Sequence, residues 1–320
     1  MKKLCLALVA CVALAACAAD AFAGERKFPA KPVNIFIHAA PGGFSDTTAR
    51  AVGPILSKEL GVPVVFHNRT GGAGAVMLNF VRNAAPDGYT IGFAPNGLVQ
   101  LGALGRAPEI QPDNFDLLAL QCIAPAAITI RSDLPYKTLE EFIEAAKANP
   151  GEFKCGTTGS GSGWHIAAKV FENKVGIKLN YVPFNGSSPT VAALMGKHID
   201  LTSVSPMEVT AGLESGDFRM LAVMGTQRSP KHPDVPTLED LGYGNVPVVA
   251  FGSFILPKGT PQDVKDTLGA ALEKAILDPS FAKLADERDF IVTYMNAEEF
   301  KKYADEQYKF YSDLVKDLDL

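Results

Sequence analysis

The 320-residue sequence has little cysteine, a single tryptophan and no excess of positive charge. Lysine and arginine total 30 against 35 aspartate and glutamate residues, a net charge of −5. This balance argues against nucleic acid or an anionic membrane as a partner held by charge. The only hydrophobic run that approaches the roughly 20 residues of a membrane span lies at the N-terminus, so this chain alone cannot form an integral transporter.

Cysteine and histidine offer little redox or metal chemistry. Only Cys122 and Cys155 follow residue 24, each in an apolar, strand-like run. We expect two buried thiols, with a disulfide in an oxidising compartment as the alternative. The histidines have no metal-ligand spacing, which predicts no metal site. No cofactor is expected either, because Met77 occupies the last glycine position of the dinucleotide motif that begins at Gly72-Ala73-Gly74.

The first residues resemble an export signal. Two lysines, an apolar stretch over 4–16 and an Ala21-Phe22-Ala23 cleavage site together predict a signal peptide at residues 1–23. Leu14-Ala15-Ala16-Cys17 supports a competing interpretation as a lipoprotein signal, in which Cys17 carries a lipid anchor. Both interpretations place the mature protein in the periplasm, outside the cytoplasmic membrane.

After residue 23, short β-branched runs alternate with helical patterns. This alternation is typical of doubly wound α/β domains with mostly parallel sheets. We expect a helix kinked by Pro54 and ended by Gly61, and a short helix capped by Ser188. The other expected helices cover 138–149, 164–175, 297–317 and a segment opened by Thr260-Pro261. Expected strands cover 33–37, 62–66, 89–93, 153–158, 179–183, 199–204 and 220–224.

Two longer extended segments, 117–131 and 246–256, look like crossings between two domains. At roughly 150 residues per domain, the mature chain has room for two. We therefore expect domain 1 to comprise 24–124 and 252–320, with domain 2 inserted as 125–251. Two crossing strands would form a hinge, and a ligand cleft would lie between the domains.

Strand-to-helix turns at 41–46, 157–165 and 184–188 are rich in glycine and in serine or threonine. Glycine lets backbone amides approach a ligand, and a helix N-terminus adds partial positive charge, so such turns suit an anion. Ordinary capping is the alternative for any one of them. Two such turns in different halves, both without lysine, favour binding. A hydrolase using Ser162 and His165 is disfavoured, because Ser160 and Trp164 replace the glycines of a nucleophile elbow.

The ordered set of short segments is similar to the substrate-binding proteins of tripartite tricarboxylate transporters, the Bug family. The matching segments include Pro41-Gly42-Gly43, Pro86-Asp87-Gly88-Tyr89-Thr90, Val182-Pro183-Phe184-Asn185-Gly186, Pro233-Asp234-Val235-Pro236-Thr237 and Pro257-Lys258-Gly259-Thr260-Pro261. The resemblance implies a periplasmic-binding-protein fold that closes on a small carboxylate and delivers it to a membrane permease. It implies no enzymatic activity, and we expect a monomer.

The resemblance also implies which residues bind the ligand: backbone amides of one loop from each domain grip the carboxylate. Carried over, the loops are Gly42, Gly43, Phe44, Ser45 and Asp46, and Thr158, Gly159, Ser160, Gly161 and Ser162 with His165 behind; Asn68, Phe184 and Gly186 complete the candidate site. We expect a side chain at Gly43 or Gly161 to block the ligand or to forbid the required backbone angles.

Some positions depart from the family pattern. His67 replaces a glutamate, Thr70 a proline, Asn185 a lysine and Val204 an aspartate. These changes concern the part of the pocket beyond the carboxylate, and they leave the identity of the ligand open. A ligand-presenting sensory partner of a histidine kinase is the alternative to transport.

Overall fold

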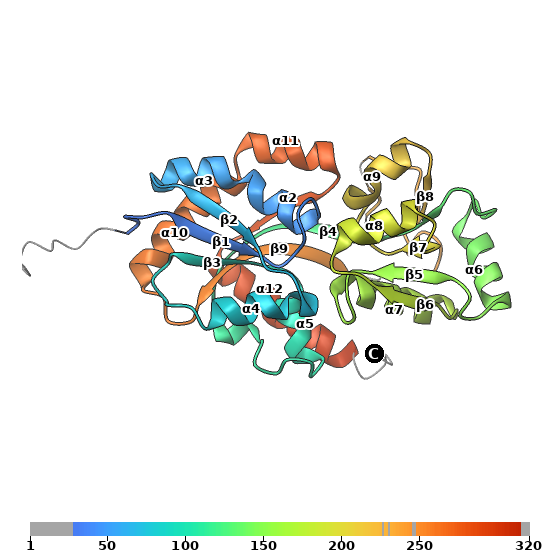
Figure 1. Ribbon diagram of the computed structural model, residues 1–320, viewed down its shortest axis with the longest axis horizontal. Helices are drawn as coiled ribbons and strands as arrows, with labels where there is room; N and C mark the ends of the chain where they lie inside the picture. Colours follow the sequence, from blue (N-terminus) through green and yellow to red (C-terminus); the bar gives the residue numbers. More distant parts are fainter. Residues whose placement is uncertain (1–27, 226, 230, 245–247, 315–320) are drawn as a thin grey trace, which may run out of the picture.

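The computed structural model describes residues 28–225, 227–229, 231–244 and 248–314. It has two α/β lobes side by side (Figure 1). The strands are β1 (Val33–Ile37), β2 (Val64–Asn68), β3 (Thr90–Ala94), β4 (Phe115–Arg131), β5 (Lys154–Thr157), β6 (Asn180–Pro183), β7 (Leu201–Thr202), β8 (Phe218–Met224), β9 (Val249–Pro257) and β10 (Ile291–Met295). The predicted signal peptide and Cys17 lie outside the described residues.

The helices alternate with these strands as expected for an α/β protein. They are α2 (Phe44–Ala51), α3 (Gly53–Leu60), α4 (Ala75–Arg82), α5 (Gly97–Ala103), α6 (Leu139–Ala148), α7 (Gly163–Val175), α8 (Ser187–Met195), α9 (Pro206–Glu214), α10 (Gln262–Ile276), α11 (Pro279–Arg288) and α12 (Ala297–Leu314), with short 3-10 turns η1 (Gly72–Gly74) and η2 (Pro112–Asn114). None of the described helices is long and apolar enough to span a membrane.

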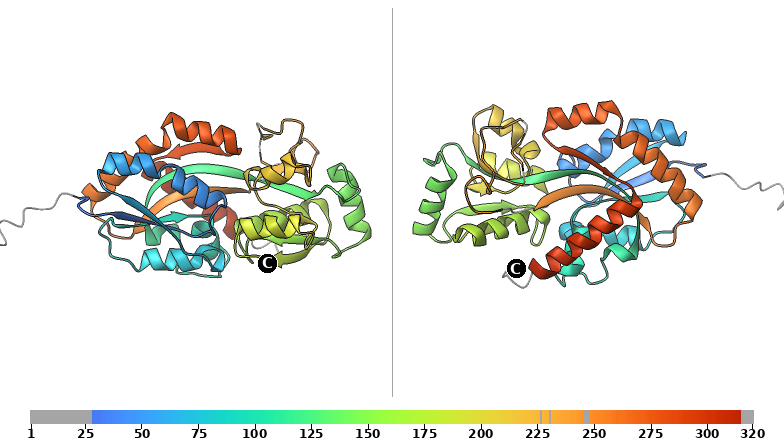
Figure 2. Two further views of the ribbon diagram at one scale, coloured as in Figure 1. Left: turned by 45° about the horizontal axis from the view of Figure 1, so that its top comes forward. Right: turned by 180° about the vertical axis from the view of Figure 1, so that it is seen from behind.

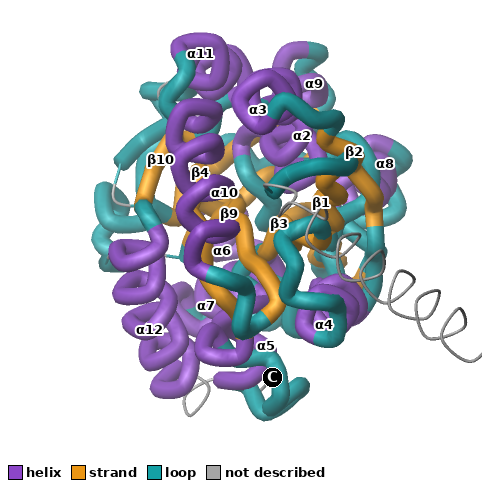
Figure 3. The backbone as a smooth tube through the Cα atoms, turned by 90° about the vertical axis from the view of Figure 1, so that its left-hand side faces the viewer, coloured by secondary structure: helices purple, strands orange, loops and turns teal. Residues whose placement is uncertain are grey.

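The first lobe is built on a mixed sheet with helices on both faces. Its strand order is β2-β1-β3-β9-β4, with β10 also paired to β4. The pairs formed by β1 with β2 and β3 are parallel, whereas β9 is antiparallel to β3 and β4. One apolar core joins α2, α3, α10 and α11 to the sheet, and a second contains α4, α5 and α12. Figure 3 shows this sheet from its end, between the two groups of helices.

The second lobe contains a smaller sheet in which β5 pairs in parallel with β6 and β7, while the end of β4 is antiparallel to β7 and β8. Thr138 is the N-cap of α6, and the amide of Glu141 donates to its Oγ1. The Glu141 carboxylate accepts from the amide of Lys137 instead of that of Thr138, so the capping box that the spacing of Thr138 and Glu141 predicts is only half formed. Both lobes are therefore α/β units, and the predicted fold class is confirmed.

β4 and β9 pass between the lobes, at the segments predicted as crossings (Figure 2). β4 pairs with β9 as far as Pro125, opposite Val249, and from Ala126 onward it pairs with β8. We propose the division into 24–124 with 252–320 and 125–251 on this change of partner.

Several elements differ from the sequence-based expectations. The kinked helix is two helices that meet at Val52–Gly53, because Pro54 lies in the first turn of α3, where its missing N–H costs nothing. The strand expected at 199–204 is only Leu201–Thr202. Helix α8 begins two residues earlier than expected, with Gly186 as its N-cap, so Ser188 is not its cap. The last three residues of the helix expected at 297–317 lie outside the described residues.

Both cysteines that follow the signal region are buried and free, which confirms the expectation of two thiols over a disulfide. Cys122 lies in the core of the first lobe, and Cys155 lies in that of the second. Burial raises the pKa of the Cys122 thiol to about 12 and raises that of Cys155 as well. Neither thiol is therefore prepared for nucleophilic chemistry.

Candidate functional site

A cavity of about 410 Å³ lies between the lobes, where the strand-to-helix turns of both meet. This volume suits a small organic molecule. Turns from the first lobe contribute residues 38–39, 43–45, 70–74 and 95–97, the second lobe contributes 158–160, 162–164, 183–187 and Glu208, and the crossing strand β9 contributes 250–251. The cavity lies at the carboxyl ends of β1, β3, β5 and β6, where open α/β sheets bind ligands.

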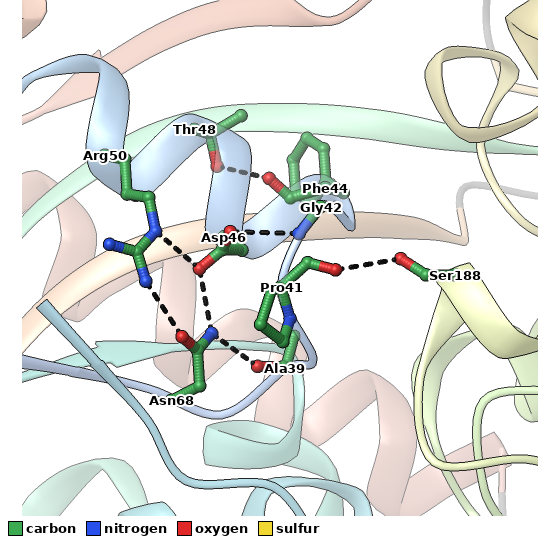
Figure 4. Close-up of polar contacts among 9 residues, drawn as sticks. All are labelled: Ala39, Pro41, Gly42, Phe44, Asp46, Thr48, Arg50, Asn68 and Ser188. Atoms are coloured by element: carbon green, nitrogen blue, oxygen red, sulfur yellow. Dashed lines mark hydrogen bonds and ion pairs between the residues drawn. The ribbon is translucent and has the colours of Figure 1, made fainter.

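The first predicted loop is held by Asp46 (Figure 4). Its Oδ2 accepts a hydrogen bond from the amide of Gly42 at 3.0 Å, and its Oδ1 accepts from Arg50 Nε and Asn68 Nδ2, both at 2.8 Å. Desolvation raises the pKa of Asp46, but these hydrogen bonds and the Arg50 charge lower it by a larger amount. The pKa of Asp46 is therefore below its ordinary value. Asp46 is therefore a carboxylate that serves its own loop.

Asn68 completes this arrangement from the end of β2. Its Nδ2 donates to the carbonyl of Ala39 as well as to Asp46, and its Oδ1 accepts from Arg50 Nη2, each at 2.8 Å. Gly42 has a φ of +82°, which favours glycine. The Arg50 guanidinium donates to both Asp46 and Asn68, so it stabilises the loop and does not face the cavity.

The second predicted loop leads into α7. Ser162 is the N-cap of this helix, and its Oγ accepts from the amide of His165 at 3.3 Å and from Thr158 Oγ1 at 2.9 Å. The imidazole Nδ1 of His165 accepts from the amide of Gly161 at 2.9 Å. Desolvation, followed by the charges of Arg106 and Lys169, lowers the pKa of His165 to about 4.

Ser162 and His165 do not form a catalytic pair. The hydrogen bond between them comes from the backbone amide of His165, while its Nδ1 is engaged by Gly161. A serine nucleophile needs the imidazole itself as a base. The geometry therefore assigns both residues to fixing the loop.

The structure divides the predicted site residues into two groups. Lining residues are Gly43, Phe44, Ser45, Thr158, Gly159, Ser160, Ser162, Phe184 and Gly186. The remainder do not line the cavity: Gly42, Asp46, Asn68, Gly161 and His165. The second group supports the loops through the hydrogen bonds described above, and direct ligand contact is not what the geometry assigns to it.

The structure gives different reasons for a glycine at Gly43 and at Gly161, the two positions where we expect a side chain to impair binding. Gly43 has a φ of −79°, which any residue adopts, so the expected backbone constraint is wrong there. A Cβ on Gly43 would have only ordinary contacts at 3.7 Å and beyond. Gly161 has a φ of +74°, and its Cβ would lie 2.2 Å from Arg106 Nη1 of the other lobe. Gly161 is therefore needed for its backbone angle, whereas the guanidinium of Arg106, at the end of a flexible side chain, can move away from an added side chain.

Sequence reasoning missed several lining residues. The turn over Thr70–Gly74 lines the cavity. In the sequence it resembles only an incomplete dinucleotide motif, although its glycines precede a helix as in the other loops. Thr70 and Asn185, two departures from the family pattern, line the cavity, whereas His67 and Val204 do not. Trp164 also lines the cavity, with 6% exposure.

Glu208 was also missed, and it changes the electrostatics of the cavity. The spacing of Ser205 and Glu208 is that of a capping box, which the structure shows at the start of α9 and which could have located this helix. Among the lining residues only His38 and Glu208 are ionisable. Desolvation lowers the pKa of His38 to about 4, and its Nε2 lies 2.8 Å from Ser45 Oγ. The imidazole is neutral at neutral pH.

The positive potential at the cavity wall therefore comes from backbone dipoles and not from charged side chains. Helices α2, α7 and α8 begin at lining residues or beside them, and their N-termini carry partial positive charge. No lysine or arginine lines the cavity. In the described part of the chain, no cluster of His, Cys, Asp and Glu is arranged to hold a metal ion.

Two α/β lobes joined by crossing strands around such a cavity define the class of periplasmic binding proteins. The solved structure of the periplasmic binding protein BugD covers 91% of this chain and 98% of its own, with a TM-score of 0.86 and 28% identity. The family model described as tripartite tricarboxylate transporter family receptor, TctC, matches residues 48–320, and the chain belongs to this family. The family consists of binding proteins, and this chain is not an enzyme.

Relatives agree along nearly the whole chain. The UPF0065 protein in the gbd 5′ region of Cupriavidus necator is 32% identical over 299 residues, which is 91% of this chain and 89% of the relative. The structure of MatC from Rhodopseudomonas palustris with bound malate is 25% identical, with a TM-score of 0.85, and covers 90% of this chain and all of MatC. The chain is thus similar to periplasmic binding proteins over both lobes.

Proposed function

We propose that this protein captures a small organic carboxylate in the periplasm and delivers it to the membrane permease of a tripartite tricarboxylate-type transporter. The observation that carries the proposal is the set of helix N-termini and glycine-rich turns around a cavity without lysine or arginine. A carboxylate bound by backbone dipoles leaves again without the breaking of a buried ion pair, which suits delivery.

The similarity to MatC, whose structure contains malate, supports the same class of ligand. We propose that Gly43, Ser45, Thr158, Ser160 and Ser162 approach the carboxylate. The ring of Phe184 would contact the rest of the ligand. Export through residues 1–23, with or without lipidation of Cys17, belongs to the same proposal.

A thermal-shift screen of mono-, di- and tricarboxylates, amino acids and aromatic acids tests the ligand class. A ligand at about 100 times its Kd adds about 2.7 kcal/mol to the free energy of unfolding, which raises Tm by several degrees. We expect acids to raise Tm and their uncharged amides to have no effect. Stabilisation by NAD or divalent ions, with no effect of any acid, would contradict the proposal.

Delivery is tested separately by uptake. Cells that lack this protein should lose uptake of the identified radiolabelled acid, and re-expression of the full chain should restore it. If uptake is unchanged while transcription of acid-responsive genes is lost, the protein serves a sensor kinase instead of a permease.

A further inference from the structure

The cavity wall contains one carboxyl group, that of Glu208, in contact with the other lobe. Its Oε1 accepts a hydrogen bond from the amide of Phe44, in the first turn of α2, at 3.3 Å. Its Oε2 accepts from the amide and the Oγ of Ser205, both at 3.0 Å. The side chain of Ser187, in the first turn of α8, also donates to it. One carboxylate therefore serves the first turns of three helices.

Among the described residues, no cation compensates the charge of Glu208. It forms no ion pair with any described residue, and the only other ionisable group in the cavity wall is the neutral imidazole of His38. Desolvation raises the pKa of Glu208, and although the hydrogen bonds from Ser187, Ser205 and Phe44 lower it, the net shift is upward. The ionised form of Glu208 is therefore stabilised only by neutral donors.

We propose that Glu208 determines specificity by restricting the ligand to one carboxylate, and that it excludes dicarboxylates of the same length. This inference rests on the proposed function. A first ligand carboxylate can still be bound between the loop over Thr158–Ser162 and the turn over Gly43–Ser45. Glu208 already accepts from the amide of Phe44 and from the side chain of Ser187, so these donors at the starts of α2 and α8 are not free for a second one. A second ligand carboxylate on the α2 and α8 side would meet a like charge in a partly desolvated cavity without lysine or arginine.

Matched pairs of acids test the inference, because they differ only in whether a methyl group or a carboxylate ends the chain. The pairs are 2-hydroxybutanoate with malate, butanoate with succinate and hexanoate with adipate. Calorimetric titration at pH 8 keeps the ligands ionised and favours the carboxylate form of Glu208, whose pKa is raised by burial. In the unmodified protein we expect the best-bound monocarboxylate to bind at least ~10-fold more tightly than its dicarboxylate partner.

Glu208→Gln removes the charge and retains the capping box, because glutamine also serves at this position. We expect this variant to reduce the ratio of monocarboxylate affinity to dicarboxylate affinity at least ~5-fold, chiefly because the dicarboxylate binds more tightly. Glu208→Ser, which also lacks the charge, should reduce this ratio too. Glu214→Gln is the matched control, since Glu214 is an exposed residue at the other end of α9, and it should leave the preference unchanged.

The outcomes separate the two proposals. If acids bind but a dicarboxylate binds as tightly as its partner in the unmodified protein, or if the folded Glu208 variants keep the original preference, the inference about Glu208 is wrong and the proposed function stands. If no acid binds to any variant or to the unmodified protein, the proposed function fails and this inference fails with it.

Discussion

The Asp46 side chain is 8% exposed and accepts hydrogen bonds from Gly42, Arg50 and Asn68. All three donors favour the charged form of Asp46. In Asp46→Asn, one carboxylate oxygen is replaced by an NH2 group, whose two N–H donors would face these donors without an acceptor. We expect a loss of about 1–3 kcal/mol in the free energy of unfolding near pH 7, because charge-assisted hydrogen bonds in a buried loop are lost.

The pH dependence gives this prediction its sign. The pKa of Asp46 is lower in the folded protein than its unfolded value of about 3.9, so its contribution is present above that value and is lost as pH falls through the folded pKa. Urea denaturation at pH 7 and at successively lower pH should show the difference between variant and unmodified protein shrinking below about pH 4. A difference that is constant with pH would contradict the assignment of a stabilising charge.

Sequence reasoning places Asp46 and Asn68 in the candidate site, but it does not decide whether their side chains face a ligand or their own loop. A carboxylate four residues after Gly42 at a helix start can face a ligand or its own loop, and the spacing is the same for both. The position of Asn68 on the neighbouring strand β2 decides between them, because its amide reaches Asp46 from behind. That contact joins residues far apart in sequence, which local patterns do not report.

At the level of turns and helices, the glycines of the two loops should respond differently to the same substitution. Gly43→Val places a branched side chain in the cavity at an allowed backbone angle, so affinity for the identified acid should fall at least ~10-fold with little change in Tm. Gly161→Val adds strain of about 1–3 kcal/mol at a positive φ and displaces Arg106, so Tm should fall.

Calorimetric titration and thermal denaturation of both variants measure these effects. Lys154→Ala is the control, because this exposed residue at the start of β5 lies away from both loops. If Gly43→Val is folded and binds the acid like the unmodified protein, the ligand does not lie against the start of α2.

Elements with a clear amphipathic pattern or a cap could be predicted, as α6 with its cap at Thr138 shows. Helix α5 could not, because its short uncharged sequence has no polar face and residues 97–101 are all buried. Helix α9 was missed although Ser205 and Glu208 have the capping-box spacing. Strand β10 was missed because it is a short, mostly half-exposed strand that pairs with β4, distant in sequence.

At the scale of the whole molecule, direct hydrogen bonds join the two lobes at the start of α2. Ser188 Oγ donates to the carbonyl of Pro41 at 3.2 Å, and Glu208 accepts from Phe44, so α8 and α9 contact the start of α2. Ser188→Ala should weaken acid binding by about 2- to 10-fold, the effect of one net hydrogen bond, through a shift of the free protein towards an open arrangement.

Small-angle scattering with and without the acid, combined with titration calorimetry, measures both consequences. The radius of gyration should fall when ligand binds, and the free Ser188→Ala protein should be the more extended. Ser312→Ala is the control, because its hydroxyl donates to Tyr308 within α12. Equal scattering curves and affinities for Ser188→Ala and the unmodified protein would contradict a role for this contact in closure.

The crossings were predictable at this scale because 117–131 and 246–256 are extended runs too long for one small sheet. The full set of lining residues could not be predicted, because these residues come from separate turns that only the tertiary packing brings together.

The change of partners along β4 has a further consequence for how such proteins can vary. Pro125 and Val249 lie opposite each other, one strand spacing apart, so the inserted lobe enters and leaves the first lobe at the same place. The segment between Pro125 and Val249 is thus covalently connected to the first lobe only through the adjacent strands β4 and β9, and we call this segment the cassette. We expect that recombination at these two points between relatives leaves the order β2-β1-β3-β9 uncut, although one apolar core continues from the first lobe into the second. New ligand preferences could then arise by exchange of half a binding cavity onto an unaltered frame.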